Sequence, residues 1–265
     1  MQSPVSFEVD EDGVATLTLN DLARRNALSR DLVGAAIAAL DQAERQKRRV
    51  VILRAAPGVS IWSSGHDVGE LPRAGKDPVE WDDPLRAFVR RIKSLSCPVL
   101  ALLEGGVWGG GCEVVFACDV IFAAPNVTFA VTPAKLGIPY HITGFPTFMN
   151  AMPRKMLNEM LFVGVPIAAE RVLSLGMIAA VVPFDRIEAV VLSCARRVVS
   201  LAPMAVTALK VGVTTLADVD GAAAPADLEM LEEARRRVFS SPDCYEGLAA
   251  LQARRPAVFQ GREVS

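Results

Sequence analysis

Three short stretches of the sequence carry residue types that could do chemistry. The loop "GIPYHITG" (137–144) places Tyr140 beside His141, although the chain has only two tyrosines and two histidines. The stretch "WSSGHDVGEL" (62–71) surrounds His66 with small residues, and "GGGCE" (109–113) ends in Glu113. Imidazole, carboxyl and phenol groups are common proton carriers in enzymes. These stretches are the first candidates for a functional site.

The glycines of two of these stretches point to backbone chemistry. Gly109–Gly111 run into an expected helix, whose free N–H groups and positive dipole end favour a developing negative charge. No Lys-Ser or Lys-Thr pair follows, so the turn is not a P-loop. The turn before His66 can likewise leave an N–H uncovered. Each turn alone also fits simple packing, and Glu113 also fits a capping charge without a catalytic role.

Periodic apolar residues predict the elements that must position these stretches. The stretch "VSFEVDEDGVATLTLN" predicts a hairpin around an Asp-Gly turn. Apolar residues from Leu32 to Leu40 recur at helical spacing after Ser29, a suitable N-cap. The β-branched run "RVVILRAA" (49–56) predicts a buried strand.

A second cycle of strand and helix follows the first. We expect a helix near 83–95, a strand in 98–105, a helix near 110–118 and a strand in 119–124. Strand signals end at about residue 183, and helices dominate the rest. The alternation predicts an α/β fold. Its helical tail has more apolar side chains than a short appendage can bury, among them Leu228, Met230, Leu231, Val238, Phe239, Leu248 and Leu251.

Composition limits the partners of the protein. Lys plus Arg number 28 against 30 Asp plus Glu, so no overall field attracts nucleic acid or an anionic membrane. The basic runs "RQKRR" (45–49) and "EEARRRVF" (232–239) fit solvated helix ends, or alternatively a phosphate subsite. Five cysteines without metal-ligand pairing predict reduced thiols, a cytoplasmic location and no metal site. No targeting segment or apolar run of membrane-spanning length is visible.

Taken together, the motifs resemble the crotonase, or enoyl-CoA hydratase/isomerase, superfamily over nearly the whole chain. The matching stretches are "NAL" (26–28), "SSGHD" (63–67), "GGGCE" (109–113), "ACDVIFAAPNVTFAVTPAKLGIP" (117–139) and "AERVLSLGMI" (169–178). The resemblance implies a spiral of β-β-α turns over residues 1–195 with a helical trimerisation segment over 196–265. It also implies a homotrimer or homohexamer and an acyl-CoA thioester as ligand.

The resemblance also assigns roles to individual residues. It implies an oxyanion hole made by the backbone N–H groups of His66 and Gly110, and a catalytic glutamate at Glu113. It places Ser64, Gly65, Asp67, Val68 and Thr132 at the substrate. The second glutamate of the family's hydratases falls here on Pro133 or, with a one-residue slip, on Ala134. Neither side chain can move a proton, which argues against hydration by a carboxylate pair.

Within the superfamily, "TPAKLGIPYHITG" and the tail "SPDCYEGLAALQARRPAVF" most resemble the members that convert methylmalonyl-CoA to propionyl-CoA and CO2. Tyr140 matches a tyrosine that lies beside the thioester in those members. The expected activity is that of a carboxy-lyase without biotin, metal or other cofactor. His141 has only its adjacency to Tyr140 in its favour and is left out of the expected site.

Decarboxylation of a malonyl-type thioester fits these residue types. Loss of CO2 leaves an enolate, which an oxyanion hole stabilises. We expect "FAV" (129–131), "GIP" (137–139) and "GFPTF" (144–148) to line an apolar pocket in which Tyr140 and Thr132 orient the carboxylate. Tyr140 or a water then protonates the α-carbon. Glu113 is either turned away or protonated by burial, because its charge would repel the substrate.

Two alternatives stay open at this stage. One is an enoyl-CoA hydratase or isomerase of the same superfamily that works with Glu113 alone. The other is a non-catalytic member that binds acyl-CoA or RNA.

Overall fold

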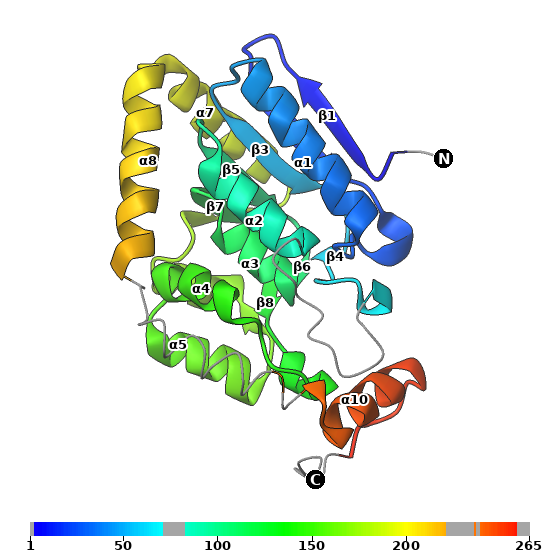
Figure 1. Cartoon of the computed structure of the whole chain (residues 1–265). Helices are drawn as coiled ribbons and strands as arrows, with labels where there is room; N and C mark the ends of the chain where they lie inside the picture. The colour runs from blue at the N-terminus through cyan, green and yellow to red at the C-terminus, as the bar shows by residue number, and fades with distance from the viewer. Residues whose placement is uncertain (1–2, 71–82, 221–235, 237–238, 259–265) are drawn as a thin grey trace.

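The computed structural model describes residues 3–70, 83–220, 236 and 239–258 (Figure 1). Most of the run at 232–239 and the apolar tail residues Leu228, Met230, Leu231 and Val238 lie outside these residues.

A six-stranded sheet carries the N-terminal half of the fold, in the order β1-β2-β3-β5-β7-β10. β1 and β2 form the predicted antiparallel hairpin, and the other neighbours in the sheet pair in parallel. All five residues of β3 and of β5 are buried, as expected for strands covered on both faces. The strands are β1 Val5–Val9, β2 Ala15–Leu19, β3 Val51–Ala55, β5 Val99–Leu103, β7 Val120–Ala123 and β10 Ala180–Val181.

A second sheet, which the sequence did not predict, holds four very short strands in the order β4-β6-β8-β9. Its strands are β4 Ile61–Ser63, β6 Gly106–Trp108, β8 Thr128–Ala130 and β9 Ile167–Ala168. The first three pair in parallel, and the chain leaves each of them into a stretch that the sequence singled out. This sheet therefore positions the candidate site.

Helices pack on the larger sheet, whose strands β3 and β5 are fully buried. α1 begins after Ser29, whose hydroxyl accepts the N–H of Leu32 at 3.3 Å, which confirms the predicted N-cap. α1 packs on β1 and β2 and against α2, whereas α7 packs on β3, β5 and β7 (Figure 1). The helices up to α7 are α1 Arg30–Arg45, α2 Pro84–Ser94, α3 Gly110–Phe116, α4 Phe145–Ala151, α5 Arg154–Asn158, α6 Ala169–Ser174 and α7 Ile187–Ser200.

Short helical turns join these elements around the site. The 3₁₀ turns are η1 Leu22–Arg24, η2 Val68–Glu70, η3 Pro133–Leu136 and η4 Ile142–Gly144, and the π-helical turn η5 is Glu159–Val163. α5 and α6 flank η5 and β9 on the far side of the small sheet.

The two C-terminal helices lie on different parts of the molecule (Figure 1). α8, Pro203–Asp220, stands beside the core, where the buried Lys210 ammonium binds Asp119 and the carbonyls of Ile92 and Cys97. α10, Pro242–Gln252, packs on η3. α7 crosses the expected boundary at residue 195, and that boundary stays a prediction.

None of the described helices is by itself long and apolar enough to cross a bilayer. α7 and residues Pro203–Thr214 of α8 reach that length and composition only as a pair bent by 108°.

Candidate active site

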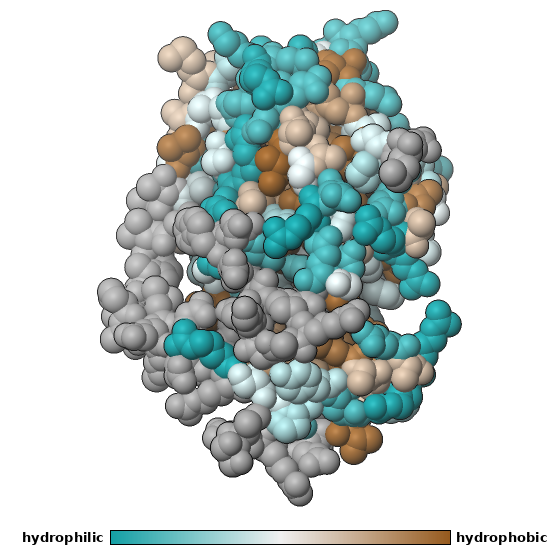
Figure 2. Space-filling view, turned by 45° about the vertical axis from the view of Figure 1, so that its right-hand side comes forward, coloured by the Kyte–Doolittle hydropathy of each residue, from teal (hydrophilic) through white to brown (hydrophobic). Residues whose placement is uncertain are grey.

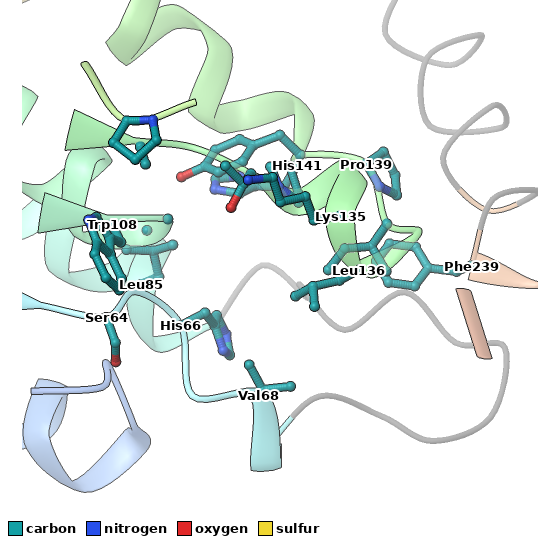
Figure 3. Close-up of a pocket in the computed structure, with 18 residues that line it drawn as sticks. Ser64, His66, Val68, Leu85, Trp108, Lys135, Leu136, Pro139, His141 and Phe239 are labelled. Carbon is teal, nitrogen blue, oxygen red and sulfur yellow. The ribbon is translucent and has the colours of Figure 1, made fainter. Parts of the chain in front are cut away.

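A pocket of about 340 Å³ lies where the chain leaves the small sheet, and its lining is mostly apolar. Six residues nominated from the sequence line it: Ser64, His66, Val68, Gly110, Thr132 and Tyr140. Figure 3 shows His66 and Val68 reaching up from the loop after β4 toward Leu136, with His141 and Lys135 on the opposite wall. Figure 2 shows this face of the molecule hollowed on the right, with hydrophobic residues in the hollow.

Two glycine turns meet at one wall of the pocket. A β-carbon on Gly65 would lie 2.7 Å from the carbonyl oxygen of Trp108 and 3.0 Å from the amide nitrogen of Gly110. Gly65 also has φ +92° and Gly109 has φ +54°, a region in which other residues are strained. The close approach of the two turns therefore requires glycine.

This contact places the two nominated backbone donors side by side. A β-carbon on Gly110 would lie 3.5 Å from the amide nitrogen of His66. Gly110 is the first residue of α3, where an N–H has no partner within the helix. In the described part of the chain no backbone acceptor is found for either N–H group. Such donors at a helix start suit an oxygen that gains negative charge.

The imidazole of His66 is held by a buried carboxylate. Its Nε2 lies 3.1 Å from Oδ2 of Asp83, and its Nδ1 lies 3.2 Å from the carbonyl oxygen of Asp67. Burial alone would lower the pKa of His66, but the hydrogen bond and charge of Asp83 outweigh it and raise this pKa. The other oxygen of Asp83 caps α2 through the N–H groups of Leu85 and Arg86.

Glu113 lies directly behind the opposite wall and shares one oxygen between two side chains. Tyr140 donates its hydroxyl to Oε2 of Glu113 at 2.7 Å, and Nε2 of His141 lies 2.7 Å from the same atom. Glu113 is 1% exposed and His141 is 5% exposed, so water does not screen this contact. The carboxylate is thus turned to Tyr140 and does not line the pocket itself.

Aromatic side chains fix the ring of Tyr140. It stacks on His141 with ring centroids 4.7 Å apart, and Phe145 and Phe148 meet it edge-on. Burial first, and then the charge and hydrogen bond of Glu113, hold the pKa of Tyr140 well above its usual range. The expectation that residues 144–148 line the pocket is wrong, because their phenylalanines pack behind Tyr140. Ala130, Ile138 and Pro139 do line the pocket, as expected.

Among the remaining nominated residues, the polar groups of Ser64 and Asp67 bind the surrounding loops. The hydroxyl of Ser64 turns to the carbonyl of Arg24 at 3.4 Å, away from the centre of the pocket (Figure 3). Asp67 does not line the pocket: one oxygen accepts the N–H of Gly69 and the other binds Arg24. Val68 and Thr132 line it, although nothing shows a contact with substrate.

Sequence reasoning missed several residues of the pocket. His141 was set aside as a mere neighbour of Tyr140, yet it lines the pocket and binds Glu113. Trp108, Leu85 and Phe239 also line the pocket, and Phe239 comes from the segment just before α10. The rarity of histidine in the chain was the available signal for His141.

The described lining of the pocket contains basic residue types but no acidic ones. Among the described residues that line it none is Asp or Glu, whereas His66, Lys135 and His141 are present. In the described part of the chain no group of three His, Cys, Asp or Glu side chains is arranged to hold a metal ion. The pocket therefore presents backbone N–H groups and one phenol to a ligand. The carboxylate of Glu113 lies behind Tyr140 and does not line the pocket.

Comparison with known proteins agrees with this geometry. The family model for enoyl-CoA hydratase/isomerase matches residues 10–262. The chain is 34% identical over 248 residues to methylmalonyl-CoA decarboxylase of Escherichia coli (strain K12), a match that covers 94% of this chain and 95% of that protein. A solved structure of methylmalonyl-CoA decarboxylase in complex with 2-nitronate-propionyl-CoA has a TM-score of 0.95 at 33% identity, covering 99% of this chain and 100% of that chain. Another, in complex with 2S-carboxypropyl-CoA, matches with the same score, identity and coverage. These likenesses confirm the expected crotonase-like fold.

Proposed function

Because the chain belongs to the enoyl-CoA hydratase/isomerase family, we propose that it decarboxylates a malonyl-type CoA thioester, with methylmalonyl-CoA as substrate and propionyl-CoA and CO2 as products. The ligands named in the structures of its relatives support an acyl-CoA as the bound molecule.

One observation carries this proposal. The pocket wall offers the adjacent N–H groups of His66 and Gly110 but no carboxylate among its described lining residues. Residues 133 and 134, where a hydratase has its second glutamate, are Pro and Ala at the start of η3. Stabilisation of an enolate needs only the donors, whereas addition of water by a carboxylate pair needs groups that this wall does not offer.

The reaction follows from this arrangement. The bond between the α-carbon and the carboxylate breaks, CO2 leaves, and the electron pair moves onto the thioester oxygen. The N–H groups of His66 and Gly110 stabilise that oxygen, and loss of one such donor raises the barrier by about 3 to 4 kcal/mol. The enzyme is then a carboxy-lyase that needs neither biotin nor a metal ion.

A panel of thioesters tests this function. The purified protein is incubated with malonyl-, methylmalonyl- and ethylmalonyl-CoA, and CO2 release is followed. We expect release from methylmalonyl-CoA above the rate without protein. Binding of all three thioesters without CO2 release would instead indicate the non-catalytic class of relatives.

A hydratase activity is the second candidate, because Glu113 lies in the first turn of α3 and reaches Tyr140 behind the pocket. Incubation with a 2-enoyl-CoA separates the two. Faster hydration of the enoyl thioester than decarboxylation of methylmalonyl-CoA would favour the hydratase.

We also propose that the protein assembles as a homotrimer or homohexamer in the cytoplasm. The large exposed apolar side chains of α8, among them Met204, Leu209 and Val213, support assembly. All five cysteines are free thiols, which supports a reducing compartment. Recovery of the protein with an oxidised, disulfide-bonded fraction from cells would contradict the location.

A further inference from the structure

Tyr140, Glu113 and His141 form a hydrogen-bonded cluster at the pocket wall. We propose that Glu113 takes up one proton when the anionic substrate binds and returns it through Tyr140 to the α-carbon after CO2 has left. The inference rests on the proposed decarboxylation and assigns the source of the proton which that reaction consumes.

The hydrogen bonds of the cluster show why a proton must enter. Tyr140 has a single hydroxyl proton, and it is donated to Oε2 of Glu113 at 2.7 Å. While that bond lasts, only the lone pairs of the phenol oxygen remain for a group in the pocket. A substrate carboxylate is an acceptor too, so it gains no hydrogen bond from Tyr140 in this state. It would also lie near the negative charge of Glu113.

One added proton removes both problems. A protonated Glu113 donates from Oε2 to the phenol oxygen, and Tyr140 then turns its own proton to the substrate carboxylate. Two carboxylates at one site favour protonation of one of them, because like charges and burial both disfavour the charged form. Among the described residues the basic side chain in contact with Glu113 is His141, at 2.7 Å from Oε2, and no Lys or Arg contacts this carboxyl.

His141 keeps the cluster satisfied in both states. Its Nε2 carries a proton, since that nitrogen lies 2.7 Å from Oε2, and this N–H binds a neutral or an ionised carboxyl. Its Nδ1 lies 2.9 Å from the hydroxyl of Thr143, which donates to a neutral imidazole. His141 therefore fixes Oε2 toward Tyr140.

One turnover returns the cluster to its starting protonation state. When CO2 has left, the α-carbon of the enolate forms a bond to the hydroxyl proton of Tyr140. The phenol oxygen takes the proton of Glu113, and Glu113 is again a carboxylate that accepts from Tyr140 and His141. One proton is consumed for each CO2, as the overall reaction requires.

Other titratable groups near the pocket are the competing sites for this proton. The thiol of Cys112 donates to the carbonyl of Val107, and burial raises its pKa to about 12, so it is already protonated. Lys135 lines the pocket as a cation. The serious competitors are His141, which contacts Glu113 itself, and the pair of His66 and Asp83 across the pocket, because histidine titrates near neutral pH.

Calorimetry in buffers of different ionisation enthalpy tests the proposal without turnover. The ligands are 2S-carboxypropyl-CoA, a thioether that bears the carboxylate, and propyl-CoA, its counterpart without one. At pH 7 the wild type should take up close to one proton more with the first ligand than with the second. The variant Glu113→Gln should lose this difference, while Glu8→Gln, a like change on exposed β1, should keep it.

The opposite results are equally clear. Equal proton uptake with both ligands, or no binding of the carboxylated one, overturns the proposal. So does a difference that survives in Glu113→Gln and disappears in His66→Gln. If Glu113→Gln does not fold, infrared spectra of the wild type with ¹³C-labelled glutamate carboxyls replace it, and the complex must then show a newly protonated glutamate. Wild type that binds and takes up the proton but releases no CO2 from methylmalonyl-CoA refutes the proposed function instead.

Discussion

Tyr140 lines the pocket and donates its hydroxyl to Glu113. Three aromatic rings and one hydrogen bond hold it, so the loop after Pro139 presents the phenol in a single orientation. Removal of its oxygen should therefore disturb chemistry much more than structure.

We expect Tyr140→Phe to lower kcat for methylmalonyl-CoA by about ten- to ten-thousandfold, the range of one lost positioning or acid/base contact. Tyr245 is the matched control, because it is the other tyrosine and lies exposed on α10. Steady-state kinetics of both phenylalanine variants measure the effect. A Tyr140→Phe enzyme that is as fast as Tyr245→Phe would remove Tyr140 from the reaction.

His66 and Asp83 give the fold a pH-dependent contribution. The raised pKa of His66 stabilises the folded state below its ordinary value of 6.5, and this contribution is lost as pH rises through the raised pKa. The pKa of Asp83 is lowered: burial raises it, but the hydrogen bond and charge of His66 prevail. The contribution of Asp83 to stability is fully present above pH 3.8, the ordinary pKa of this group, and is lost as the pH falls through the lowered pKa.

The free energy of unfolding should therefore differ more between wild type and His66→Ala at about pH 5.5 than at about pH 8.5. Denaturant titrations at the two pH values measure this. A difference that is the same at both, or larger at the higher pH, would show that the ion pair does not stabilise the fold.

Single residues of the site were predictable from sequence only where a local pattern marks them. Glycine turns mark the stretches around Gly110 and His66, and the family resemblance selects these two residues, whereas Tyr140 stands out by its rare type in a restricted loop. The contact of His141 with Glu113 joins residues 28 positions apart, and it exists only because the loop packs on α3. Such a contact leaves no local trace in the chain.

At the scale of elements, α10 supports the pocket wall from behind. A β-carbon on Gly247 would lie 2.0 Å from the carbonyl oxygen of Leu136, and one on Gly137 would lie 2.2 Å from that of Asp243. Backbone therefore meets backbone where α10 crosses η3, whose Leu136 lines the pocket. Only glycine permits that approach.

Gly247→Ala should destabilise this contact by about 1 to 3 kcal/mol, as overpacking of a closed interface does. It should also raise KM for the thioester, because η3 shifts. Gly34→Ala in α1 is the control, since nothing lies within 4 Å of its added carbon and it should stabilise the helix by about 0.5 to 1 kcal/mol. Equal melting temperatures for the two variants would contradict the close packing.

The long elements were predictable because their signals are local and repeated. The hairpin, α1 with its cap, β3, α2, β5, α3 and β7 all lie where the pattern placed them. The four strands of the small sheet have two or three residues each, too few to show an alternating pattern. They are strands because tertiary structure brings them together, and the local pattern of apolar residues does not report such long-range contacts.

At the scale of the whole molecule, the described part of α8 exposes several large apolar side chains. Met204 is 86% exposed, and Leu209 and Val213 on the same helix are 69% and 70% exposed. Such side chains mark an interface between proteins when they gather on one element.

Light scattering of the purified protein at micromolar concentration should report a trimer or a hexamer. The double variant Met204→Glu, Leu209→Glu should have a lower mass by light scattering. Assembly would bury the two new carboxylates in an apolar interface, and burial of an unpaired charge is unfavourable. A monomeric wild type would mean that this surface is free, and the assembly would have to be abandoned.

The fate of one carbon atom tests the proposed decarboxylation most directly. Methylmalonyl-CoA labelled with ¹³C in its free carboxylate is incubated with the protein, and the label is followed by NMR. Decarboxylation predicts that the label appears as ¹³CO2 and bicarbonate while an equal amount of unlabelled propionyl-CoA forms, with no biotin or metal added. Label that stays in the thioester, under conditions in which the thioester demonstrably binds, would contradict it.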